Sequence, residues 1–210
     1  MAKHRNPLIC RATGIEPRNI GIDWMHVISL GIAQVVLAFF IWALIDVNVY
    51  VIAGGAAEIQ ELTIVRLGHD LDTWYEAEHR RGREHCRVQN LLVSLLGTAS
   101  KPTFKYHAAE TNGVLHFCVA LARRFAIKLG ASARWWTQAL SSLEQIVELI
   151  HECKTVFPLG KQQLFCDQIC LHLAACKRLM LPLKPKHHML VELGGRCCTR
   201  FRGIVFPFLL

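Results

Sequence analysis

The chain has 210 residues, of which 52% are hydrophobic and 19% are charged, a composition that is typical of globular proteins and excludes an intrinsically disordered one. One sizeable hydrophobic core can form at this length, and the mean hydropathy of +0.29 requires that a membrane-spanning segment be considered. The net charge of +8 favours polyanionic partners, either nucleic acid or an anionic membrane surface.

The nine cysteines are an odd number, so they cannot all form disulfides within one chain. The first 22 residues are polar and basic, and they lack the apolar run of a secretory signal. We therefore expect reduced thiols in a cytosolic or nuclear protein.

A long uncharged segment follows this basic lead-in. Residues 27–45 contain no charged side chain, and apolar residues occupy every face of the helix that they would form. Such a helix is either fully buried in a protein core or long enough to cross a bilayer. The residues alone leave both interpretations open.

The remaining segments predict a mainly α fold with four or five helices and at most one or two short strands. Apolar residues recur at helical spacing in four segments, which are 56–80, 108–129, 133–153 and 161–180. The clearest period comprises Trp136, Leu140, Leu143, Val147 and Ile150, whereas on 161–180 the expected buried face is Phe165, Ile169, Leu173, Cys176 and Met180. Residues 47–51 are β-branched and aromatic, which favours an extended piece, and 98–102 predicts a loop.

Asp23 and His26 stand three apart at the start of the apolar segment, and this spacing puts both side chains on one face of a helix. An acid and an imidazole together can hold a divalent metal or move a proton. The spacing alone favours a simpler interpretation, in which Asp23 is a helix N-cap and His26 is partly buried.

Two further clusters contain residues that bind phosphate or metal in other proteins. The "KPKHH" stretch at 184–188 can contact phosphate, although its pattern alone favours a solvated loop before a short helix. Cysteines 166, 170 and 176 surround His172 on a predicted apolar helix. Zinc is one interpretation of that cluster, but cysteines in such a helix usually act as small hydrophobic residues, which is the interpretation we favour.

The segment "DWMHVISLGIAQ" resembles the D-x-M-H-x-x-x-x-G signature around the second catalytic aspartate of CACTA-like and KDZ-like DNA transposases, which have a ribonuclease-H-like core. "LKPKHHMLVEL" resembles their later PKHH element, and the chain between the two looks like their helical insertion region. The joint order is similar to that of transposon-derived proteins of dinoflagellates, and the resemblance covers residues 14–193.

The resemblance implies metal-dependent DNA cleavage and strand transfer, in which three carboxylates hold two Mg²⁺ or Mn²⁺ ions. It assigns Asp23 to the second carboxylate, hence to a metal ligand, and His26 to a residue that orients it or touches DNA. It assigns nucleic-acid binding to the late basic element, namely Lys184, Lys186, His187 and His188.

This chain departs from the family pattern at both ends. Only 22 residues precede Asp23, whereas the family's first aspartate lies well upstream. Glu192 stands where these proteins more often have a histidine, so we do not assign it as the catalytic glutamate. We therefore expect a basic lead-in (1–22), a helical transposase-core fragment (23–193) and a tail foreign to the family (194–210), with no catalysis by this chain alone and neither Mg²⁺ nor Mn²⁺ bound.

The expected protein is thus a truncated, inactive, transposase-like product of a mobile element. It binds DNA weakly and without sequence preference and is nuclear if it is expressed, while homo-oligomerisation stays open. The alternative is a small membrane protein with one span and a basic helical soluble part, which the resemblance disfavours because it makes 27–45 a core helix. A helical interaction module that docks a partner through its apolar stripes is a third hypothesis.

Overall fold

This computed structural model describes residues 23, 25–153, 158–182 and 186–191. The elements in chain order are η2 (Met25–Ala33), α1 (Gln34–Asp46), α2 (Ala56–Arg80), η3 (Val93–Leu96), β1 (Gly97–Thr98), β2 (Lys101–Pro102), α3 (Ala108–Arg124), α4 (Ala126–Leu129), η4 (Gly130–Ser132), α5 (Ala133–Cys153) and α6 (Leu159–Arg178). Residues 186–191 are also helical. The predicted mainly α fold with at most one or two short strands is confirmed.

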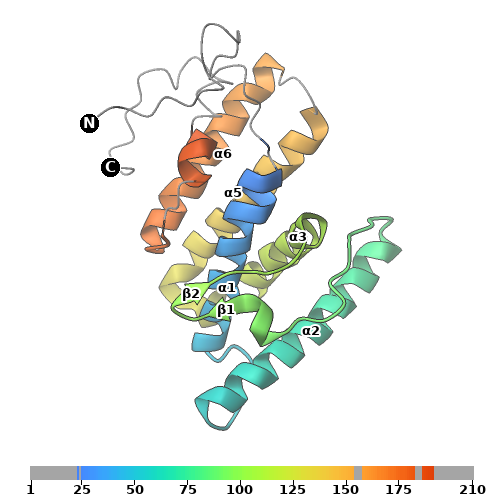
Figure 1. Cartoon of the computed structure of the whole chain (residues 1–210), viewed down its shortest axis with the longest axis vertical. Helices are drawn as coiled ribbons and strands as arrows, with labels where there is room; N and C mark the ends of the chain where they lie inside the picture. Colours follow the sequence, from blue (N-terminus) through green and yellow to red (C-terminus); the bar gives the residue numbers. More distant parts are fainter. Residues whose placement is uncertain (1–22, 24, 154–157, 183–185, 192–210) are drawn as a thin grey trace, which may run out of the picture.

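The apolar segment forms the central helix of the molecule. Its first part, η2, has π-helical geometry and continues directly into α1. The helix α1 packs against α3 and touches α5 where the rings of Phe40 and Trp136 meet (Figure 1). Among the described helices, Met25–Asp46 alone is long and apolar enough to cross a membrane, and 72% of its 18-residue apolar window is buried inside the protein. Since apolar residues cover all of its faces, other helices can pack around it on several sides.

The long helices α5 and α6 pack against each other, and α5 also packs against α3 (Figure 1). The predicted stripe on α5 is almost entirely buried, because Trp136, Leu140, Leu143 and Val147 all lie in the core. The predicted face of α6 is correct except at Met180, which is 89% exposed. Met180 lies two residues past the last residue of α6 and has a positive φ of 56°, so the helical spacing no longer applies to it.

The predictions for the connecting segments are partly wrong. Residues 47–50 form a turn, because the side chain of Asn48 both accepts from the Ile52 N–H and donates to the Ile52 carbonyl, each at 2.8 Å. The expected loop at 98–102 is the tip of a small antiparallel hairpin, in which Gly97 pairs with Pro102. Gly97 has a φ of +68°, which a glycine adopts without strain.

Candidate functional site

Asp23 caps the first turn of the central helix and also pairs with a histidine. Its Oδ1 accepts the backbone N–H of His26 at 3.2 Å, and its Oδ2 lies 2.6 Å from Nδ1 of the same residue. Both side chains are more than half exposed. The predicted cap and the predicted acid–imidazole pair are therefore one arrangement, although His26 is exposed where the simpler interpretation expected partial burial.

The contacts of Asp23 set its charge. The hydrogen bond from the His26 side chain, followed by the one from the His26 backbone, keeps the pKa of Asp23 below its usual range. The carboxylate is therefore ionised at neutral pH. An exposed ionised carboxylate can bind a divalent cation, but Oδ2 would then have to share its lone pairs between the cation and the imidazole.

Lys186, from the basic element at 184–188, contacts the first turn of the central helix. The ammonium group of Lys186 donates to the backbone carbonyl oxygens of His26, at 2.7 Å, and Leu30, at 3.3 Å. These carbonyls belong to η2, whose π-helical geometry is rare in proteins and is often found at functional sites. The structure thus brings together two sequence elements that lie 160 residues apart.

Gly31 makes this approach possible. A Cβ atom at this position would lie 2.2 Å from Cδ of Lys186 and 2.9 Å from the His26 carbonyl oxygen. The aliphatic stem of Lys186 therefore occupies the space that any larger residue at position 31 would need. The glycine of the D-x-M-H-x-x-x-x-G signature is required here by packing, because the side chain of Lys186 crosses the helix at this position.

We expect Gly31→Ala to destabilise the protein by about 1–3 kcal/mol, the usual cost of overpacking a close contact. The lysine stem can shift, but the helix backbone oxygen cannot move away easily. Urea unfolding of the two proteins measures the loss. Gly160→Ala is the matched control, because Gly160 is also helical and a Cβ there meets nothing within 4 Å; equal effects of the two substitutions would contradict the crowding at Gly31.

The other residues of the basic element face different surroundings. His187 is 2% exposed and points toward α6, so its ring does not face solvent as a DNA-contacting residue would. His188 is exposed, whereas Lys184 lies outside the described residues. Of the residues assigned to nucleic acid, His188 presents an exposed side chain, and Lys186 is half-buried with its ammonium on η2.

A cleft of about 630 Å³, which the sequence did not predict, opens beside the start of η2. Met25 and Ser29 of η2 line it, together with three imidazoles, those of His85, His116 and His151. Burial, together with the charge of His116, lowers the pKa of His85 below its usual value. Nδ1 of His116 lies 2.7 Å from a carboxylate oxygen of Glu144.

Two groups of metal-ligating side chains come together among the described residues, and neither includes Asp23. One is His116 with Glu144 and Glu148, beside the cleft, and the other is His172 with Cys176 and His187, in the core. Sequence spacing gave no signal for the pairing of His116 with Glu144, because they lie 28 residues apart on different helices. No family model, curated protein or solved structure matches this chain.

Proposed function

We propose that this chain is a transposase-like protein derived from a mobile element, which binds DNA weakly and without sequence preference and does not cut it. Asp23 takes the position of the second metal-binding carboxylate, and His26 orients it. The observation that carries the proposal is the contact of Lys186 with the backbone of His26. It joins, in space, the two segments on which the family resemblance is based.

The lack of nuclease activity follows from the chemistry of the site. In-line phosphoryl transfer by two metal ions needs several carboxylates that share the ions. Asp23 belongs to neither group of metal-ligating side chains among the described residues, and the imidazole of His26 occupies one of its oxygens. A single carboxylate does not hold two Mg²⁺ or Mn²⁺ ions, so we expect this chain to bind neither ion at Asp23.

The net charge of +8 supports an electrostatic affinity for DNA. Because the ammonium group of Lys186 binds helix carbonyls, we assign the phosphate contacts of the basic element to Lys184 and His188. Such contacts carry no sequence information, which is why the binding should not discriminate between duplexes. A nuclear location follows from this partner.

Fluorescence anisotropy with two unrelated DNA duplexes tests the proposal. With the two phosphates contacted by Lys184 and His188 neutralised, we expect affinity to fall about 12-fold between 50 and 200 mM salt, equally for both duplexes. Lys184→Ala should lower the slope of log affinity against log salt by about 0.9. Lys101→Ala removes the same charge from an exposed position on β2 and should leave the slope almost unchanged; equal losses would contradict a local site.

A supercoiled plasmid incubated with the protein and Mg²⁺ or Mn²⁺ tests the lack of nuclease activity. We expect no metal-dependent nicking, and no difference between the unmodified protein and Asp23→Ala. Nicking that requires the metal and is abolished by Asp23→Ala would overturn this part of the proposal, because it would make Asp23 an active metal ligand.

The alternative of a single-span membrane protein has the length and hydropathy of Met25–Asp46 in its favour. Against it, most of that segment packs against other helices of the same chain. Alkaline carbonate extraction separates the two proposals. Release of the expressed protein into the supernatant favours the transposase-like protein, and pelleting with lipid favours the membrane protein.

A further inference from the structure

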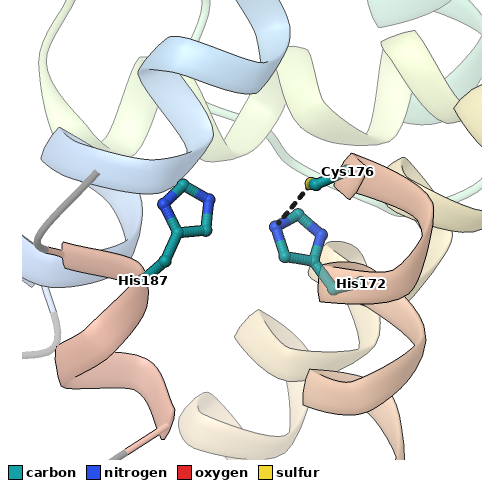
Figure 2. Close-up of side chains that lie close together, drawn as sticks. All are labelled: His172, Cys176 and His187. Atoms are coloured by element: carbon teal, nitrogen blue, oxygen red, sulfur yellow. Dashed lines mark hydrogen bonds between the residues drawn. The ribbon is translucent and has the colours of Figure 1, made fainter. Parts of the chain in front are cut away.

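The core contains a cluster of three metal-ligating side chains that the proposed function does not use. His172 and Cys176 lie one turn apart on α6, and His187 comes from the helix at residues 186–191. Their ligand atoms all lie within 4.8 Å of one another, and all three residues are buried. Figure 2 shows the two rings and the thiol turned toward one another between these helices.

The hydrogen bonds fix the proton positions in this cluster. Nδ1 of His172 lies 2.9 Å from the carbonyl oxygen of Ala139, which can only accept, so Nδ1 carries the proton. Nε2 of His172 is therefore unprotonated and accepts a hydrogen bond from the thiol of Cys176, whose Sγ lies 3.4 Å away. Metal-ligating histidines commonly donate their second ring N–H to a carbonyl in this way, which orients the ring.

One distance in the cluster already fits a tetrahedral metal site, and the others are within reach of one. Zinc bonds of about 2.0–2.1 Å to nitrogen and 2.3 Å to sulfur place N and S ligands about 3.6 Å apart and two N ligands about 3.4 Å apart. Nε2 and Sγ already have this separation, at 3.4 Å. The rings of His172 and His187 are parallel to within 7°, with 5.9 Å between their centroids, and a shift of up to about 1.4 Å would complete the set.

We propose that His172, Cys176 and His187 bind one Zn²⁺ ion, with a fourth position filled by water. Two imidazoles and a thiolate are donors that Zn²⁺ prefers, whereas Mg²⁺ and Mn²⁺ prefer oxygen ligands. Binding replaces the thiol proton of Cys176 by the metal, so each ion bound releases one proton.

The burial of the cluster supports a structural rather than a catalytic role. Cys176 and His172 are both fully buried, so a substrate has no access to the thiol or to the imidazole. Neither is an exposed nucleophile or a general base. The ion would join residues 186–191 to α6, and through Lys186 this short helix holds the turn that contains His26.

The other ligand group, His116 with Glu144 and Glu148, offers a weaker case. Glu148 is exposed, and its carboxylate already accepts a hydrogen bond from Gln145 at 2.7 Å. The approach of His116 to Glu144 is explained by their own hydrogen bond. Exposed acidic groups of this kind are common without a metal, so this group carries no proposal.

The experiment uses the full chain after removal of metal by a chelator, followed by titration with Zn²⁺ alone against a chromophoric competitor. We expect one ion per chain, one proton released per ion, and a higher midpoint of thermal unfolding. Mg²⁺ at the same concentrations should have no effect. Absence of stoichiometric Zn²⁺ binding would overturn the inference, whatever the outcome of the DNA experiments, since the site does not depend on the proposed function.

Matched variants locate the site. Cys176→Ala and His187→Ala should each weaken Zn²⁺ binding by at least about 100-fold. The controls are Cys170→Ala, on an exposed position of the same helix, and His188→Ala, beside His187 but exposed, and both should bind as the unmodified chain does. Equal binding by all four variants would mean that Zn²⁺ binds elsewhere, and the inference would fail.

Because a core variant can fail to fold, a measurement on the unmodified chain completes the test. Co²⁺ takes the same site as Zn²⁺ and reports its ligands through its absorption spectrum. We expect intense visible bands of a tetrahedral ion together with a thiolate-to-metal band of one sulfur ligand. A weak octahedral spectrum without the thiolate band would overturn the inference.

Discussion

Replacing Phe40 by alanine should destabilise the protein by about 3–5 kcal/mol, the usual cost of removing a fully buried aromatic ring. Phe40 lies on α1, is 0% exposed, and its ring centroid is 5.3 Å from that of Trp136 on α5. The substitution therefore removes a contact that joins the central helix to α5. Since native domains are stable by only about 5–15 kcal/mol, a urea unfolding curve will show the loss as a large shift of the midpoint.

Phe39→Ala is the matched control, because Phe39 is the adjacent residue on the same helix and is only partly buried. We expect its cost to be no more than about half that of Phe40→Ala, in proportion to the apolar area that it removes from water. The comparison also bears on the membrane alternative. A helix surrounded by lipid would give small and similar effects at both positions, which would contradict the packing of α1 as a core helix.

Periodicity located the long helices well, because their buried stripes are set by local sequence. The predicted segments 56–80 and 133–153 coincide with α2 and α5. Residue propensity failed at residues 47–51, where β-branched residues indicated an extended piece. There the side chain of Asn48 forms two hydrogen bonds with the backbone of Ile52 and stabilises a turn instead. Residue propensities do not capture such a contact, because they are averages over many structural contexts.

In the candidate site, too, one contact could be predicted from the sequence and another could not. The contact of Asp23 with His26 follows from a spacing of three, so the sequence alone predicted it. No local rule brings Lys186 to His26; the resemblance placed both in one family core but did not predict which atoms meet.

The directions of adjacent side chains in "KPKHH" depend on where the short helix begins, which is at residue 186, inside this stretch, and not after it as the pattern predicted. Successive residues of a helix point about 100° apart. Lys186 can therefore reach η2 while His187 turns toward α6. The predicted solvated loop placed both on the surface, so the ligand cluster in the core could not be seen from the sequence.

Raising the pH from 10 to 12 should unfold the protein, because its three tyrosines are held in the neutral form. The chain contains three tyrosines, at positions 50, 75 and 106, and burial is the first cause that raises the pKa of each above its ordinary value. Tyr75 is the most buried, at 2% exposed, and its pKa rises to about 12. Its hydroxyl donates to the carbonyl of Cys86 and accepts the N–H of Val88, which ties that segment to α2.

The sign of the effect follows from linkage between proton binding and folding. A tyrosine with a raised pKa in the folded state holds its proton more tightly there than in the unfolded chain, where it titrates near pH 10. Its contribution to stability is complete below pH 10 and is lost as the pH rises toward 12. For Tyr75 the difference of about two pH units corresponds to about 3 kcal/mol, and Tyr50 and Tyr106 act in the same direction.

Phenolate absorbance measured against pH, beside circular dichroism on the same samples, tests this expectation. In concentrated urea the tyrosines should titrate near pH 10, whereas in the folded protein phenolate should appear only as helicity is lost. Tyr75→Phe removes one titrating group and should reduce the steepness of the alkaline loss of stability, although it also removes the two hydrogen bonds of the hydroxyl at neutral pH. Three tyrosines that ionise reversibly near pH 10 while the helices stay intact would contradict the full burial of Tyr75 and the partial burial of Tyr50 and Tyr106.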